Sequence, residues 1–154
     1  MNRFLPPLLF ALGSLLAFSG CSLPRLIILK DPLTPEEHVN LGVTYEKQGE
    51  LDNAVREYEV AAKKLPRAYL YLGNAYFQKK DWKGAEKAYQ KAIQKDPHNA
   101  DAYNNLAWLY YTRKENLDDA ERLAKKALDL NPAKRETYLD TLEKIREEKK
   151  ESGH

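Results

Sequence analysis

Few residues of this chain have the type and spacing that catalysis or metal binding requires. The single cysteine is Cys21, so neither an internal disulfide nor a multi-cysteine metal site can form. No nucleophile elbow, phosphate-binding loop or metalloprotease motif occurs. The three histidines are far apart in the sequence, at His38, His98 and His154. The sequence therefore predicts a protein that is not an enzyme, with no catalytic residue, no metal ligand and no cofactor.

Cys21 is the one side chain whose position indicates a covalent reaction, because it follows the longest apolar stretch of the chain. After Arg3, the residues from Phe4 to Phe18 are apolar apart from two prolines, a glycine and a serine. This stretch is shorter than the roughly 20 residues that a membrane-spanning helix needs. A charged start, an apolar middle and an end of small residues are typical of a secretory signal peptide. The alternative that these residues leave open is an uncleaved anchor followed by an incidental cysteine.

The last four residues of this segment, Phe18-Ser19-Gly20-Cys21, resemble the lipobox of bacterial lipoproteins. The resemblance implies cleavage before Cys21 and acylation of that cysteine, so that residues 1–20 form a signal peptide and residues 21–34 a lipidated tether. Two acyl chains suffice for stable anchoring, since each buried methylene contributes roughly 0.8 kcal/mol. Ser22 follows the cysteine, and bacterial lipoproteins without an aspartate at this position usually travel to the outer membrane. The resemblance therefore implies the outer membrane, with the protein facing the periplasm.

The balance of charges excludes a general nucleic-acid binder. The chain of 154 residues has 25 Lys and Arg against 23 Asp and Glu, a formal net charge of +2. Nucleic-acid binding requires a surplus of basic residues on one face. Apolar residues make up 43% and charged residues 31% of the chain, which is typical of neither a disordered segment nor a membrane bundle. Seven glycines against ten tyrosines favour helices over a turn-rich β protein.

An internal repeat organises the sequence after residue 34. The pattern Leu41-Gly42-x-x-Tyr45 recurs at 72–76 and, with alanine for glycine, at 106–110, and each unit ends at a proline. It resembles the tetratricopeptide repeat, a helix–turn–helix unit of about 34 residues. The resemblance implies an all-α fold, an α-solenoid of about three helix–turn–helix repeats plus a C-terminal capping helix. The repeats are expected over 35–132, at about 35–65, 66–99 and 100–132, with the capping helix and a charged tail over 133–154.

Small residues predict where the two helices of each repeat approach closely. One small residue of each first helix is expected to lie against an alanine of the second helix, in the pairs Gly42–Ala54, Gly73–Ala85 and Ala107–Ala120. In the third repeat Ala107 and Ala124 replace the usual glycine and aromatic residue. The packing there is therefore expected to be looser, or to be compensated by the helix that follows.

The last helix is expected to cap the array. Tyr138, Leu142 and Ile145 recur at i, i+4 and i+7 and form one apolar stripe. The opposite face is almost wholly charged, and Lys144 is expected on it. A repeat array needs such an end helix, apolar toward the last repeat and polar toward water.

The resemblance also implies a concave groove, lined by the first helix of each repeat, that binds peptides or proteins. The groove positions fall on eight residues: Val39, Val43, Leu70, Asn74, Phe77, Asn104, Trp108 and Tyr111. Trp108 is expected at the centre, and the open alternative is that Phe77 and Tyr111 belong to the core between repeats. Chaperone-binding members clamp a C-terminal carboxylate with Lys, Arg and Asn. That specificity is not expected here, because the corresponding positions hold Val39, Val43, Tyr71, Asp101 and Asn105.

Together these features predict a membrane-anchored lipoprotein that acts as a protein-interaction scaffold or adaptor in the bacterial cell envelope. Its expected partners are envelope proteins or peptides in the groove and the membrane at the lipid anchor, with no nucleic acid. The alternative is a structural or self-associating envelope component whose groove is filled by its own tether. The apolar run Leu26–Leu29 is the part of the tether that would fill it.

Overall fold

The computed structural model describes residues 31–153, and this part of the chain is helical with no strand. The helices are α1 (Pro35–Lys47), α2 (Leu51–Ala62), α3 (Ala68–Gln78), α4 (Trp82–Lys95), α5 (Ala100–Arg113), α6 (Leu117–Leu130), the 3₁₀ turn η1 (Pro132–Lys134) and α7 (Arg135–Glu151). The predicted all-α fold is confirmed. None of these helices is long and apolar enough to cross a membrane. The predicted signal peptide, Cys21 and the Leu26–Leu29 run lie outside the described residues.

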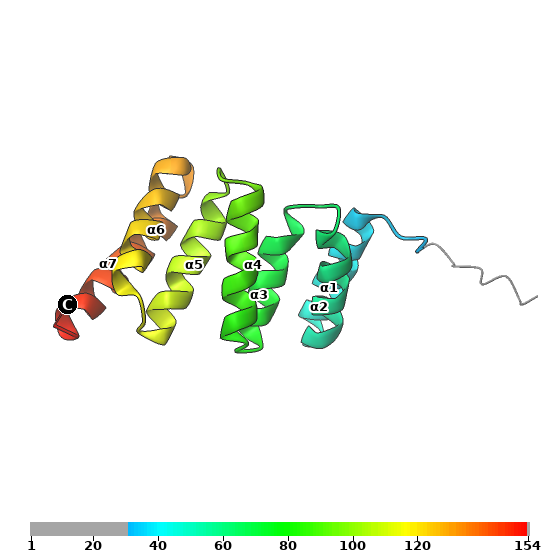
Figure 1. Cartoon of the computed structure of the whole chain (residues 1–154), viewed down its shortest axis with the longest axis horizontal. Coiled ribbons are helices and arrows are strands. Elements are labelled where there is room, and N and C mark those ends of the chain that lie inside the picture. The colour runs from blue at the N-terminus through cyan, green and yellow to red at the C-terminus, as the bar shows by residue number, and fades with distance from the viewer. Residues whose placement is uncertain (1–30, 154) are drawn as a thin grey trace, which may run out of the picture. The chain divides into compact units, whose positions relative to one another are not determined.

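The helices form two layers. Each α-helix packs against the next along the chain, and the odd-numbered helices α1, α3, α5 and α7 also contact one another in sequence. Among residues 31–153, no such contact joins α2 to α4 or α4 to α6. The helix pairs can be followed in Figure 1 from cyan α1 and α2 to the orange and red of α7. The first helices of the repeats therefore lie side by side and form one continuous surface.

The start of α1 is fixed by local hydrogen bonds and by a buried histidine. Thr34 and Glu37 form a reciprocal capping box, in which the Thr34 Oγ1 accepts from the Glu37 amide at 3.2 Å and the Glu37 Oε2 accepts from the Thr34 amide at 2.7 Å. His38 is buried, with its Nδ1 2.6 Å from Glu57 Oε2 and its Nε2 3.1 Å from Asp31 Oδ2. This histidine therefore connects Asp31, in the segment before α1, to Glu57 of helix α2.

The turn inside each repeat begins with the same geometry. One residue after the first helix takes a left-handed conformation, with φ of 78° at Gly49, 60° at Lys80 and 54° at Lys114. The next amide donates back to the carbonyl of the signature tyrosine, at 2.9, 2.9 and 3.1 Å in the three repeats. This pattern is a Schellman-type helix end, which satisfies carbonyls that the helix leaves without a partner. The three first helices therefore end in the same way, and the third turn has a second left-handed residue, Asn116 with φ of 52°, before α6 begins.

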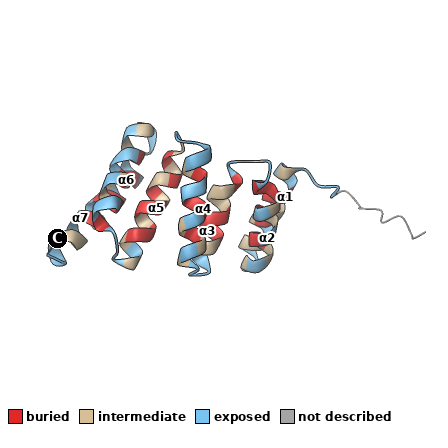
Figure 2. Cartoon of the chain, in the orientation of Figure 1, coloured by how far each residue is buried: buried red, intermediate tan, exposed pale blue. Residues whose placement is uncertain are grey.

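The close approach of helices at Gly42 and Gly73 is confirmed, but the residues that press on them differ from the expected alanines. A Cβ built on Gly42 would lie 2.4 Å from Tyr58 Cε1, and one on Gly73 would lie 2.4 Å from Tyr89 Cε1. Tyr58 and Tyr89 lie four residues after the predicted alanines, one helical turn further along the same face. Each glycine is therefore required by a buried tyrosine ring. The buried faces between the helices are the red parts of Figure 2.

The third repeat uses a different pair of residues. Ala107 and Ala124 stand where the other two repeats have glycine and tyrosine, and both are fully buried. They belong to one apolar cluster with Leu142 and Ile145, which α7 contributes. The following helix therefore packs into the same cluster as these two alanines, which agrees with the second of the two alternatives that the sequence leaves open. The predicted apolar stripe of α7 is confirmed, because Tyr138, Leu142 and Ile145 are all buried.

Tyrosine hydroxyl groups also join neighbouring repeats. Tyr76 of α3 donates to Glu59 of α2, and Tyr110 of α5 donates to Glu86 of α4, both at 2.8 Å. Burial and the hydrogen bond to the carboxylate, in that order of effect, raise the pKa of each of these two phenols to about 12. The hydroxyls therefore stay protonated near neutral pH and remain donors. Each repeat is thus bonded to the one before it by the same kind of contact.

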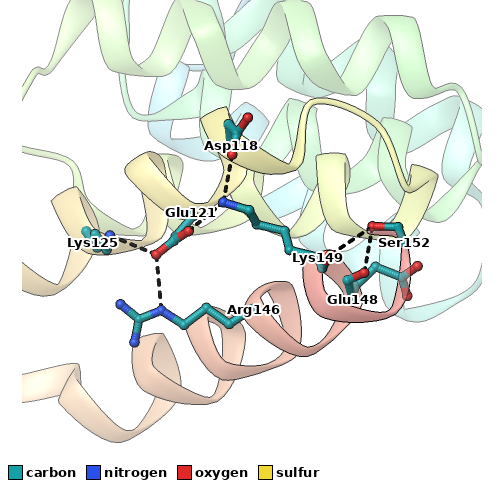
Figure 3. A network of polar contacts seen from close by, with 7 residues as sticks. All are labelled: Asp118, Glu121, Lys125, Arg146, Glu148, Lys149 and Ser152. Atoms are coloured by element: carbon teal, nitrogen blue, oxygen red, sulfur yellow. Dashed lines mark hydrogen bonds and ion pairs between the residues drawn. The ribbon is translucent and has the colours of Figure 1, made fainter. Parts of the chain in front are cut away.

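A network of ion pairs fastens α7 to α6 (Figure 3). The Glu121 carboxylate lies 2.7 Å from Lys125 Nζ, 2.8 Å from Lys149 Nζ and 3.1 Å from Arg146 Nε. Lys149 also pairs with Asp118 at 2.6 Å. Hydrogen bonds from Lys125 and Lys149 lower the pKa of Glu121 to about 2. The capping helix is therefore held by an apolar face and by a carboxylate that three cations surround.

Candidate functional site

Two adjacent depressions lie on the surface formed by the first helices. We name them the α1–α3 depression and the α3–α5 depression, after the helices between which they lie. The α1–α3 depression has a volume of about 400 Å³ and is lined by Val43, Glu46, Lys47, Tyr71, Asn74 and Gln78. The α3–α5 depression has a volume of about 260 Å³ and is lined by Glu46, Asn74, Phe77, Gln78, Tyr89, Asn105 and Trp108. They share Glu46, Asn74 and Gln78, so together they form one interrupted groove across three helices.

The floor of the groove is a set of fixed polar groups. Asn74 Oδ1 accepts from the Tyr89 hydroxyl at 3.0 Å and from Asn105 Nδ2 at 2.9 Å. Glu46 accepts from the Tyr58 hydroxyl at 2.8 Å and from Gln78 Nε2. Amides and carboxylates of this kind can bond the N–H and C=O groups of an extended peptide backbone. The groove therefore presents polar groups whose positions are set before any ligand arrives.

Buried tyrosines below the floor hold these polar groups in place. Burial raises the pKa of Tyr58 and of Tyr89 well above the ordinary range of a phenol, and the negative charge of Glu46 raises both further. Both hydroxyls are therefore neutral donors over the physiological pH range. The same two rings occupy the space beside Gly42 and Gly73. The signature glycine of each of these repeats thus lets a tyrosine reach the groove floor from the second layer.

Trp108 lies at the α5 wall of the groove and has neighbours on α5 and α7. The ring centroids of Trp108 and Tyr111 are 4.9 Å apart, and the Nζ of Lys144 is 5.3 Å from the ring centroid of Trp108. The sequence predicts Lys144 on the polar face of the last helix, and its ammonium does pair with Asp140 at 2.7 Å. However, because α7 packs against α5, Lys144 also covers part of the groove tryptophan. Lys144 therefore contacts the groove tryptophan from α7, although it lines neither depression.

The structure brings four of the eight predicted groove residues together at the depressions: Val43, Asn74, Phe77 and Trp108. Tyr111 lies beside them, with its ring tilted against that of Trp108. Leu70, Phe77 and Tyr111 are partly buried and pack against the core cluster of the second and third repeats. Val39 and Asn104 are buried, with 4% and 8% of their surface exposed, and line neither depression. The adjacent Asn105 takes the place predicted for Asn104. A binding role for each of these residues remains a prediction.

Sequence reasoning missed Glu46, Lys47, Gln78 and Tyr89, which all line the groove. Three of them, Glu46, Gln78 and Tyr89, show what the repeat pattern can and cannot indicate. Glu46 follows Val43 by three residues, and Gln78 follows Asn74 by four, so each lies about one turn further along the groove face. Tyr89 belongs to a second helix and reaches the groove only because Gly73 has no side chain. The first two could be found from helical spacing, whereas the third requires the packing of two helices.

A larger depression, of about 660 Å³, lies at the other side of the array. It is lined by Tyr103, Leu123 and charged residues of α6 and α7, among them Glu121 and Lys149 of the α7 network. Its cations and carboxylates are largely bonded to one another. No group of three or more His, Cys, Asp or Glu residues in the described part of the chain could hold a metal ion.

Comparisons with known proteins agree with the repeat pattern. Family models described as "TPR repeat" and "Tetratricopeptide repeat" match residues 73–113, 99–131 and 38–67, which together span more than half of the chain. Stress-induced-phosphoprotein 1 of Caenorhabditis elegans is 38% identical over 69 residues, which are 45% of this chain and 20% of that protein. Human WD and tetratricopeptide repeats protein 1 is 44% identical over 61 residues, which are 38% of this chain and 9% of that protein. The chain thus matches a fifth or less of the length of these relatives.

Two solved structures share the fold. The first TPR domain of Spaghetti (RPAP3), solved with an HSP90 peptide, superposes with a TM-score of 0.68 at 24% identity, covering 78% of this chain and 96% of that one. The TPR2B domain of yeast Sti1, solved as a complex with pHsp70, gives a TM-score of 0.69 at 22% identity and covers 73% and 96%. The family models and these superpositions agree on the repeat fold. The chain is a member of the tetratricopeptide-repeat proteins.

Proposed function

We propose that this protein is an interaction scaffold that binds an extended segment of another protein in the groove across α1, α3 and α5. The observation that carries the proposal is the pair of depressions that share Glu46, Asn74 and Gln78. Each is near or below the lower end of the roughly 300–1,000 Å³ typical of small-molecule sites, and both are open to a neighbouring depression. Two adjacent depressions of this size suit side chains that point to the same side of an extended peptide, with amides between them for its backbone.

The solved relatives support a peptide ligand without fixing its sequence. One was solved with an HSP90 peptide and the other as a pHsp70 complex. The Lys, Arg and Asn clamp of chaperone-binding members is replaced here by Val39, Val43, Tyr71, Asp101 and Asn105. Asp101 is already bonded to Lys134 and to Tyr138, at 2.7 and 2.8 Å. The ligand proposed here is therefore not the acidic C-terminus that such a clamp holds.

We further propose that the scaffold is a lipoprotein anchored through Cys21 to the outer membrane, where its groove faces envelope proteins in the periplasm. The support for this part is the sequence alone, because a signal-peptide pattern ends at the one cysteine in a lipobox-like context. A tether then separates the anchor from the first repeat. Such an arrangement would keep the groove near the membrane surface.

The test uses peptides selected from a random heptapeptide display library on the purified full chain. Trp108→Ala should raise the dissociation constant of the selected peptides at least about tenfold, because a tryptophan at a binding surface commonly contributes about 2 kcal/mol or more. The matched control is Tyr69→Ala, which removes another partly buried aromatic residue that lines a separate depression with Glu59 and Tyr76. Helix content, measured by circular dichroism, should be the same for the three proteins.

Other outcomes would redirect the proposal. Unchanged affinity in a folded Trp108→Ala variant would mean that the groove is not the recognition surface. If deletion of residues 22–30 increases the affinity for the peptides and changes the elution volume, the groove is filled by the protein's own tether. That result would favour the structural, self-associating alternative.

A further inference from the structure

The α3–α5 depression contains one ionisable group that carries a charge at neutral pH. Of the seven residues that line it, Glu46 is the only Asp, Glu, Lys, Arg or His, and the phenol of Tyr89 is neutral. The remaining lining residues are amides and aromatic rings. The depression therefore combines a single negative charge with apolar walls.

The charge of Glu46 is not neutralised by the groups that hold it. Its carboxylate accepts from the Tyr58 hydroxyl at 2.8 Å and from the Gln78 amide, and both donors are uncharged. Among residues 31–153, no Lys, Arg or His forms an ion pair with it. Lys47 lines the α1–α3 depression and not the α3–α5 depression. The effect of Glu46 reaches Tyr89 in the next repeat, whose pKa its charge raises.

The walls beside this carboxylate are aromatic. Phe77 and Trp108 line the depression, and the Phe77 ring is packed edge-on against Trp82 at 5.4 Å, which fixes its place. Aromatic faces attract cations, with Trp the strongest. The protein itself provides an instance, because the ammonium of Lys144 lies 5.3 Å from the Trp108 ring centroid. A carboxylate next to aromatic walls is a site for a basic side chain.

We infer that the α3–α5 depression takes a Lys or Arg side chain of the bound peptide, and that the α1–α3 depression takes an apolar side chain two residues away. This inference rests on the proposed function. In an extended peptide, residues i and i+2 point to the same side about 6.6 Å apart, which suits two adjacent depressions. Val43 and Tyr71 supply the apolar contacts of the second depression, which Lys47 also lines. The preferred ligand is thus basic and apolar, opposite in sign to an acidic peptide.

The experiment repeats the heptapeptide selection on the full chain, on Glu46→Gln and on Glu59→Gln. Glutamine keeps an oxygen that can accept from Tyr58, so the Glu46 variant loses the charge without losing the buried acceptor. Glu59 is the matched control, because it also accepts from a tyrosine hydroxyl at 2.8 Å but lies on α2, outside the groove. Synthetic copies of the selected peptides are then measured by fluorescence anisotropy.

Wild-type protein and Glu59→Gln should enrich peptides with Lys or Arg two residues from an apolar residue. Glu46→Gln should lose the basic preference and bind the wild-type peptides at least about tenfold more weakly, and raising the salt concentration should weaken only the wild-type and control complexes markedly. Selected peptides that need Trp108 but are acidic or neutral, or that bind Glu46→Gln as well as wild type, would overturn this inference and leave the proposed function standing. Peptides that are indifferent to Trp108 would overturn both.

Discussion

The contact between Gly73 and Tyr89 makes the identity of each residue depend on the other. The ring of Tyr89 fills the position where a Cβ on residue 73 would lie, and its hydroxyl extends past the glycine to Asn74. The third repeat shows the other solution, with alanine at both positions and α7 filling the space. Substitutions at Gly73 and Tyr89 should therefore not have independent effects on stability, which a double-mutant cycle can test.

Gly73→Ala should destabilise the wild-type protein by about 1–3 kcal/mol, because the new methyl group cannot fit beside the ring. In a Tyr89→Ala background the same change should stabilise the protein by up to about 1 kcal/mol, since alanine favours a helix over glycine by that amount. Urea denaturation of the four proteins measures both effects. An effect of the same sign in both backgrounds would contradict the assigned contact.

Single residues also show how far the sequence could predict the groove. Asn104 and Asn105 are neighbours of the same type, and a rotation of about 100° separates their directions on a helix. The repeat resemblance assigns the groove to the first helices but does not decide between two adjacent asparagines. The bond from Asn105 to Asn74 decides it, and that bond depends on how α5 packs against α3. Glu46 required only helical spacing, so it could have been predicted.

At the scale of helices, the capping helix α7 combines a predicted and an unpredicted feature. The stripe of Tyr138, Leu142 and Ile145 follows from spacing alone, because one helix face must be apolar to pack. The contact of Lys144 with Trp108 does not follow, since it depends on α7 lying against α5 as well as α6. Periodicity thus predicts which face of a helix is buried, but not which other helices it meets.

The docking of α7 should depend on acid through Glu121. Its pKa of about 2 in the folded protein is below the value of about 4.5 of a free glutamate, so Glu121 stabilises the fold above about pH 5. This contribution should be lost progressively as the pH falls from about 5 to 2. The urea midpoint of Glu121→Gln should therefore lie below that of wild type at pH 7, and the difference should shrink over this range.

The matched control for this titration is Glu143→Gln, which removes an exposed carboxylate of α7 that lies outside the network. Its difference from wild type should be small and should vary little with pH compared with that of Glu121→Gln. A difference between wild type and Glu121→Gln that stays constant from pH 7 to pH 2 would show that the ion pairs do not hold α7.

For the whole molecule, the repeat array is stabilised by contacts between neighbours only. Helices pack against the next helix or the next but one, and the hydroxyl bonds of Tyr76 and Tyr110 each join adjacent repeats. This is why three short sequence motifs were sufficient to predict the fold of residues 35–151. The proposed cellular location is different, because that proposal rests on the sequence around Cys21 and not on any contact within the array.

The anchor can be tested on the whole protein expressed in a bacterium with a lipoprotein pathway. Wild-type protein should appear in the membrane fraction, be released by detergent and begin at an acylated Cys21. Cys21→Ser should remain an unprocessed and unlipidated precursor, because the acyl chains are attached to the thiol. Ser22→Ala, which leaves the cysteine intact, should be processed as wild type. An unmodified Cys21 in the wild-type protein, shown by mass spectrometry, would refute the anchor.

The hydrogen bonds of Asn74 link the shape of the groove to the angle between two repeats. One oxygen of this residue accepts from Tyr89 of its own repeat and from Asn105 of the next. The floor of the groove is therefore also a contact between the second and third repeats. Any force that opens the angle between α3 and α5 must stretch that pair of bonds, and any ligand that enters there must fit the angle they set. The curvature of the array and the occupancy of the groove are therefore coupled. If the chain is anchored and binds a peptide as proposed, a pull between its first repeat and its capping helix would act on the peptide as well as on the fold.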